Sequence, residues 1–287
     1  MTNITHDPVV KRPRALKGRD LVNMGELNVG EDLLLNNVGT NLARAVPVLE
    51  PHPVQGDREI AILGGGPSLQ RFLPQIKEMR NGQKMSLVTT NGTYGWALEN
   101  GMRPSAQVLV DARAFNKRFV TPHVLDCRYF LSSQCHPEVF DELEGKDHVY
   151  MWHARATQKI GEFIEGWYAC QNKTPYFVPG GSTVMLRTIP LLASLGFVKM
   201  HIFGFDSCLV EDNHHSYSQP ENENDTVIKV TVPGSERSFH CHPWMVWQAQ
   251  EFIDMTGMYP EFVELNVYGD GLISDIVRVG AKSLEEG

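Results

Sequence analysis

The sequence predicts an α/β fold in which helices cover both faces of a mostly parallel sheet. Short apolar runs alternate along the chain with longer segments of helical periodicity. This alternation is typical of parallel strands joined by right-handed crossovers. A glycine-rich turn follows the first apolar run, at residues 64–68, and opens the first helix of the pattern. With 287 residues, the chain is long enough to bury a complete core.

The part of the chain before the first strand predicts an N-terminal extension. Residues 1–20 are polar and basic and lack periodicity, which is typical of a frayed tail. Apolar side chains recur at helical spacing over residues 21–48, so we expect one or two short helices, followed by a proline-containing linker. We therefore assign residues 1–56 to a tail and helical extension, and residues 57–287 to the main domain.

The first half of the main domain contains five predicted strands. A helix over residues 68–80 follows the first strand, and the helix after the second strand ends at the C-capping pair Asn100-Gly101. The strands are expected at residues 59–63, 85–90, 107–110, 128–132 and 148–152.

The second half begins with a predicted helix over residues 182–195 and a strand over residues 199–203. Residues 226–242 predict a late β-hairpin, because two strand-like runs flank Pro233-Gly234. A helix over residues 243–256 and a last strand over residues 262–267 close the predicted domain.

Two glycine-rich segments predict a site for a nucleotide phosphate. In residues 64–68 the glycines permit close approach of a ligand, and the helix start that follows offers N–H groups to an anion. Residues 180–183 form a second such helix start. Ligands of these sheets bind beyond the carboxyl ends of the strands, so both segments are expected to hold one donor. Each segment could instead be a purely structural turn or cap.

Other nucleotide sites fit the sequence less well. Leu69 stands where the dinucleotide fingerprint has its third glycine, and no Gly-Lys-Ser/Thr follows the turn, which excludes a P-loop.

Polar residues follow three other predicted strands. Asn91 can offer a base or ribose both a donor and an acceptor, although a turn role is an alternative. Asp111 and Asp206 could hold a metal ion, orient a hydroxyl or cap a helix. His214 and His215 come shortly after Asp206 and are candidates for a general base.

The composition of the chain argues against several classes of function. A net charge of −8 argues against a nucleic-acid or anionic-membrane surface, and no apolar run reaches the length of a membrane span. Five scattered cysteines and a polar N-terminus without a signal-peptide pattern favour a cytoplasmic protein. The spacing of His240, Cys241 and His242 matches no standard zinc site, so no metal ligands are predicted.

The motifs resemble a known family. Gly-Gly-Gly-Pro-Ser-Leu after a strand is similar to the opening of a domain shared by motility accessory factors and archaeal hydroxymethylpterin diphosphokinases. It is also similar to that of the bacterial sialyltransferases that use CMP-sialic acid. The resemblance covers roughly residues 30–270. Its further matches are residues 37–42, Asn91, residues 99–104, Asp111, residues 181–184, 195–196 and 202–206, and His214/His215.

The resemblance implies a Rossmann-like domain that uses a nucleotide-activated donor. In the sialyltransferases a histidine acts as base, tyrosines help the phosphate leave, and no metal is needed. In this chain the resemblance implies that His214 or His215 is the base and that Tyr217 helps the phosphate leave. The diphosphokinases instead hold magnesium with acidic residues after strands two and three. This chain has Asn91 and a lone Asp111 there, which favours glycosyl transfer.

The leading hypothesis is a transferase that moves a sialic-acid-like sugar from CMP to a hydroxyl acceptor, which could be a glycan, a protein or a small molecule. The alternatives are a magnesium-dependent pyrophosphokinase acting on a pterin-like alcohol and a non-catalytic nucleotide-binding protein. Each of these three hypotheses is compatible with assembly of the chain into a homo-oligomer. The predicted catalytic residues are His214, His215 and Asp206. The predicted donor-binding residues are Gly64, Gly65, Gly66, Pro67, Ser68, Asn91, Asp111, Gly180, Gly181, Ser182 and Thr183.

Overall fold

In the computed structural model the chain divides into two compact units, which we describe separately. The structure describes residues 29–54, 58–82, 85–210, 215–217, 226–257, 259 and 263–285. The described residues of the first unit fall within Asp57–Met85 and Phe197–Gly287, and those of the second fall within Asp20–Gly56 and Ser86–Gly196. The tail predicted at residues 1–20 lies outside the described residues, and the predicted domain boundary after residue 56 stays a prediction.

The first unit is built on three parallel strands in the order β1-β6-β9. They are β1 (Glu59–Leu63), β6 (Lys199–Phe203) and β9 (Glu264–Tyr268). Leu63 pairs with Phe203, and Phe203 pairs with Tyr268, so the three strands end level with one another. The buried rings of Phe203 and Tyr268 stack with their centroids 4.4 Å apart and fix this end of the strands in the core.

Helices and a hairpin complete the first unit. They are η1 (Pro67–Phe72), α2 (Leu73–Asn81), the antiparallel pair β7 (Ile228–Thr231) and β8 (Ser238–Cys241), α7 (Pro243–Thr256) and α8 (Leu272–Glu285). The single helix predicted over residues 68–80 is divided into η1 and α2. Pro74 explains the division, because it lacks the N–H that would continue one helix through this point.

The second unit contains four parallel strands in the order β5-β4-β3-β2. They are β2 (Ser86–Thr90), β3 (Ala106–Leu109), β4 (Arg128–Ser132) and β5 (Val149–Trp152). Each lies within a residue of its predicted position.

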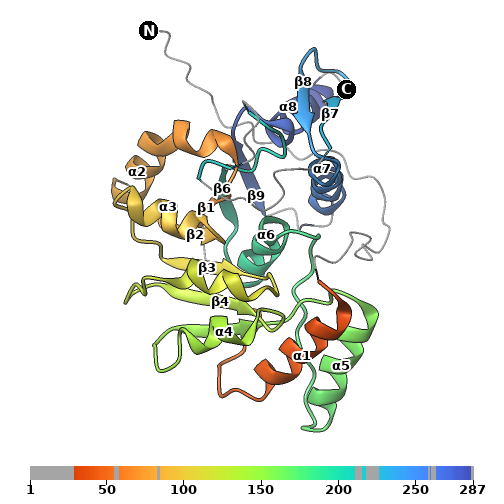
Figure 1. Ribbon diagram of the computed structural model, residues 1–287. Coiled ribbons are helices and arrows are strands. Elements are labelled where there is room, and N and C mark those ends of the chain that lie inside the picture. The colour runs from red at the N-terminus through yellow and green to blue at the C-terminus, as the bar shows by residue number, and fades with distance from the viewer. Residues whose placement is uncertain are drawn as a thin grey trace. The chain divides into compact units, whose positions relative to one another are not determined.

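Six helical segments accompany these strands: α1 (Glu31–Leu42), α3 (Thr93–Glu99), η2 (Ala114–Val120), α4 (Pro137–Asp141), α5 (Gln158–Ala169) and α6 (Val184–Ser194). Helices α1 and α5 lie side by side (Figure 1). Their apolar faces join the core of this unit through Val38 and Ile164, which are both fully buried with Tyr129 of β4.

The structure confirms the predicted α/β class. Parallel strands alternate with helices in both units, the late hairpin is present, and α1 represents the N-terminal helical extension. Among the described helices, none combines the length and apolar character needed to cross a membrane.

Candidate functional site

The level strand ends of the first unit bring three glycines to one edge. Gly64 follows β1, Gly204 follows β6 and Gly269 follows β9. Gly204 has a φ of 63°, and a Cβ there would lie 2.3 Å from the carbonyl oxygen of Gly64. Only glycine permits this approach, so the two turns pack backbone against backbone.

Asp206 links the turn after β6 to the start of η1. Its side chain is 3% exposed, and its Oδ2 accepts a hydrogen bond of 2.8 Å from the backbone N–H of Ser68. The N–H of Gly66 donates to Gly204 O at 2.8 Å, and Pro67 has no N–H. An internal carboxylate therefore takes the place at Ser68 N that the sequence suggested for a phosphate. Within residues 64–68, the Gly65 N–H makes no hydrogen bond to another described residue.

Burial controls the charge of this carboxyl group. It raises the pKa of Asp206 above its ordinary value of 3.8, while the hydrogen bond from the Ser68 N–H opposes that rise. The second oxygen, Oδ1, has no hydrogen-bond partner within the described part of the chain. Asp206 is thus held as a buried connector between two turns.

Residues 215–217 dock onto the same glycine turn. The Ser216 N–H donates to Gly65 O at 2.9 Å, and the Ser216 hydroxyl donates to Gly66 O at 2.7 Å. His215 Nδ1 lies 3.2 Å from Gly65 O. His214, the other predicted base, lies outside the described residues. The structure therefore places one predicted base, His215, directly against the predicted glycine turn.

The rings of His215 and Tyr217 form a parallel stack over Gly65. Their centroids are 5.2 Å apart and their planes differ by 4°. A Cβ on Gly65 would lie 2.5 Å from the Tyr217 hydroxyl and 2.8 Å from His215 Nδ1, so this position needs glycine. A carbonyl oxygen only accepts hydrogen bonds, so Nδ1 carries a proton and Nε2 holds the lone pair of the neutral ring.

The turn after β9 completes this edge and was missed from the sequence. A Cβ on Gly271 would lie 2.5 Å from Asp206 O, and Ile273 N donates to that same oxygen at 3.3 Å. Asp270 forms an ion pair with Arg71, and its carbonyl oxygen accepts from Arg237 Nη2 at 2.7 Å. The signal was Gly-Asp-Gly after a strand, followed by apolar residues at the helical spacing of α8.

In the second unit, Asn91 occupies a special backbone position after β2. Its φ is 47°, its carbonyl oxygen accepts from Gln107 Nε2 at 2.9 Å, and its side-chain Oδ1 is buried without a partner among the described residues. Asparagine tolerates this conformation better than most residues. Asn91 therefore has a structural role in the turn, and its Oδ1 accepts no hydrogen bond from the described residues.

Asp111, predicted to bind the donor, is engaged by its neighbour Arg113. The Arg113 backbone N–H and Nε each donate to Asp111 Oδ1 at 3.0 Å, and the two side chains form an ion pair. The carboxylate is therefore already neutralised by a guanidinium two residues away.

Residues 180–183 form the start of α6. Thr183 is the N-cap, and its hydroxyl accepts from Leu186 N at 3.5 Å. Gly180 has a φ of 137°, and a Cβ there would lie 2.6 Å from Leu186 O. Gly180 is thus required by local packing, while Gly181 and Ser182 lead into the helix start. This segment and the glycine turn belong to different units, so their action on one donor stays a prediction.

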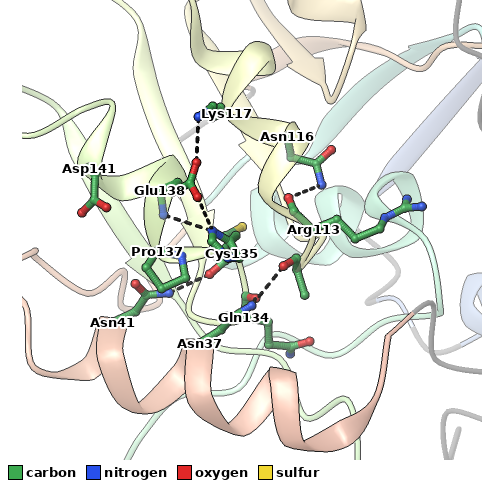
Figure 2. A network of polar contacts seen from close by, with 12 residues as sticks. Asn37, Asn41, Arg113, Asn116, Lys117, Gln134, Cys135, Pro137, Glu138 and Asp141 are labelled. Carbon is green, nitrogen blue, oxygen red and sulfur yellow. Dashed lines mark hydrogen bonds and ion pairs between the residues drawn. The ribbon is translucent and has the colours of Figure 1, made fainter.

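An unexpected polar network fixes the segments that follow β3 and β4 (Figure 2). Asn37 Nδ2 donates to Ala112 O at 3.0 Å and Gln134 O at 3.1 Å. Asn41, one turn further along α1, donates to Ser133 O at 3.1 Å and Cys135 O at 2.7 Å. Two asparagines four residues apart on an otherwise apolar helix face were the signal in the sequence.

Comparisons with known proteins agree with this architecture. The model of a family described as "6-hydroxymethylpterin diphosphokinase MptE-like" matches residues 32–212. The structure of MAf glycosyltransferase from Magnetospirillum magneticum AMB-1 is similar with a TM-score of 0.63 and 17% sequence identity. That similarity covers 91% of this chain and 42% of the other, so this chain spans less than half of its neighbour's length. At this identity the likeness concerns the fold. No curated protein gives a significant match.

Proposed function

Because the chain belongs to the MptE-like family, we propose that it is a transferase that uses a nucleotide-activated donor. We further propose that the donor is a CMP-activated, sialic-acid-like sugar and that the acceptor is a hydroxyl group. The family description names a diphosphokinase, and the structural neighbour is named a glycosyltransferase. Both names denote group transfer, and the contacts in this chain favour the glycosyl type.

The position of His215 carries the proposal. Its Nδ1 donates to Gly65 O, so Nε2 is the basic atom of the neutral ring. In the proposed reaction Nε2 takes the proton of the acceptor hydroxyl, and the acceptor oxygen bonds to the sugar. The bond between the sugar and the phosphate oxygen breaks, and CMP leaves with its electron pair. Negative charge grows on the phosphate at that moment, so fixed hydrogen-bond donors stabilise the transition state more than the ground state.

Two groups beside His215 could supply such donors. The Gly65 N–H makes no hydrogen bond to another described residue, and the Tyr217 hydroxyl lies over the same glycine. Asp206 supports this arrangement indirectly, because it holds the start of η1 through Ser68 N.

The magnesium-dependent pyrophosphokinase is the second candidate, favoured by the family description. It would need Asp111 and Asp206 as magnesium ligands. Asp111 is paired with Arg113, and Asp206 is buried with a raised pKa, so neither presents an accessible, unpaired carboxylate to a Mg²⁺ ion that keeps its own waters. These described residues do not fit a magnesium site.

The decisive experiment supplies CMP-sialic acid and a panel of hydroxyl acceptors and measures released CMP. The variants are His215→Ala, His214→Ala and, as a control at an exposed histidine, His52→Ala. We expect His215→Ala to lower turnover by about 100-fold or more while CMP affinity is retained.

Three other outcomes are informative. Unchanged turnover in His215→Ala would reject the base, and loss in His214→Ala alone would move that role to His214. Binding of CMP without turnover of any donor would support the non-catalytic alternative.

A further inference from the structure

We propose that Ser216 is the positioning residue that fixes the ring of His215, and that Gly65 is its necessary counterpart in the glycine turn. The consequence for catalysis rests on the proposed function. The consequence for the ring itself, its position and its tautomer, does not.

Ser216 makes two hydrogen bonds to the glycine turn. Its N–H and its hydroxyl donate to the carbonyl oxygens of two consecutive glycines, Gly65 and Gly66, at 2.9 and 2.7 Å. Two bonds from one residue to successive peptide groups fix both the position and the direction of the backbone next to His215. With a single hydrogen bond, the backbone could still rotate about the axis of that bond.

The same carbonyl oxygen determines which nitrogen of His215 carries the proton. Gly65 O receives the Ser216 N–H and also His215 Nδ1, at 3.2 Å. A carbonyl oxygen has two lone pairs, so it can accept both bonds. Ser216 thereby holds Gly65 O at the place where it selects the Nδ1–H tautomer. Nδ1 stays protonated in the neutral and the charged ring, so Nε2 is the atom that exchanges its proton.

The rings of His215 and Tyr217 occupy the space next to Gly65. His215 and Tyr217 flank Ser216 in sequence and stack in parallel planes, with both polar atoms near Gly65. The atoms that a Cβ on Gly65 would approach most closely belong to these two side chains. A methyl group at this position would therefore displace the rings before it disturbed the turn.

The test uses the full chain labelled with ¹⁵N-histidine, and the His215 ring signals are assigned by their loss in His215→Gln. In the wild type we expect the neutral ring as the Nδ1–H tautomer. Ser216→Ala should shift the ring toward a mixture of tautomers, and Ser216→Thr, which keeps the hydroxyl, should restore the wild-type signal. Gly65→Ala should move the ring signals, whereas Gly95→Ala, at a glycine with open space around its Cβ position, should not.

Kinetics supply the catalytic readout. Ser216→Ala should lower kcat by about three- to tenfold, the effect of one hydrogen bond, with the donor KM nearly unchanged. An Nε2–H ring in the wild type, or a Ser216→Ala ring with the wild-type tautomer, would overturn the positioning role. Full turnover in His215→Ala would instead reject His215 as the base, and absence of turnover in the wild type with every CMP-activated donor would refute the proposed function; in either case the ring spectra would still decide the role of Ser216.

Discussion

At the scale of single residues, burial decides whether a polar side chain carries charge. His153 follows β5 and is completely buried, with Nδ1 3.0 Å from the Ser133 hydroxyl and Nε2 2.8 Å from the Tyr168 hydroxyl. Burial lowers the pKa of His153 from 6.5 to about 4. Both partners are hydroxyls, so no carboxylate is present in these contacts to favour the charged ring, and the side chain is neutral at pH 7.

This neutrality predicts a loss of stability in mild acid. Between pH 6.5 and about 4 the unfolded chain protonates His153 while the folded chain does not, so unfolding becomes more favourable as the pH falls. The full effect is about 3 kcal/mol, from 1.36 kcal/mol for each unit of pKa difference. Urea unfolding at pH 7.5 and pH 5 should show a smaller pH effect in His153→Gln than in the wild type. The exposed-site control His52→Gln should behave like the wild type, and equal pH effects in all three proteins would refute the assignment.

Asp206 is expected to change stability with pH in the opposite direction to His153. Its pKa is raised in the folded state, so folding takes up a proton, and this group's contribution is largest below pH 3.8 and is lost as the pH rises through the folded value. At pH 7, Asp206→Asn keeps an oxygen for Ser68 N and removes a group whose charged form is disfavoured by burial, so it should unfold at a urea concentration no lower than the wild type. Asp206→Ala leaves Ser68 N unpaired and should be less stable than Asp206→Asn by about 1–3 kcal/mol. An Asn variant less stable than the Ala variant would contradict this role.

Sequence patterns placed His215 and Asp206 after the same strand, but they could not show which atoms each would contact. The Asp206 side chain turns toward the start of η1, which is 138 residues away along the chain. Glycines in two other turns, Gly66 and Gly271, leave room for it, because a Cβ at either position would clash with Asp206. Contacts at such separation depend on the assembled strands, and a single sequence holds no periodic signal for them.

At the scale of elements, α1 is held by polar contacts as well as by its apolar face. Asn37 and Asn41 are buried, and their amide groups donate to four carbonyl oxygens beyond β3 and β4. The helix therefore fixes the segments at the carboxyl ends of these strands, where ligands of such sheets bind.

A matched pair of variants isolates this contribution. Asn41→Ala removes the donor from Ser133 O and Cys135 O and should lower the free energy of unfolding by about 1–3 kcal/mol. Asn36→Ala makes the same change at an exposed position of the same helix and should shift stability by less than about 0.5 kcal/mol. Denaturant unfolding measures both, and equal effects would show that the buried hydrogen bonds add nothing.

The elements that were predicted well have strong local signals, and those that were missed include two short segments and two longer helices, α5 and α8. Helix α7 occupies the predicted residues, and its start has Pro243 at the first helical position. The segments η2 and α4, of seven and five residues, are too brief for periodicity to show. Helix α5 could have been found, because the capping residue Thr157 precedes apolar residues at helical spacing.

At the scale of the whole molecule, fold and family are better determined than the donor. Alternating strands and helices predicted the α/β class, and the ordered motifs identified the family that the match over residues 32–212 supports. The choice of donor depends on a few side chains, because the family description names a diphosphokinase whereas a protein of similar fold is named a glycosyltransferase.

A nucleotide screen by thermal unfolding tests that choice on the intact chain. A ligand that binds the folded state at 100 times its Kd adds about 2.7 kcal/mol of stability and raises Tm by several degrees for a chain of this size. We expect CMP and CMP-sialic acid to raise Tm equally with EDTA and with Mg²⁺, because the acidic residues Asp111 and Asp206 are engaged within the protein. ATP and GDP serve as controls at the same concentrations and should leave Tm unchanged. A shift with ATP that requires Mg²⁺, and none with CMP, would reject the CMP donor and favour pyrophosphoryl transfer.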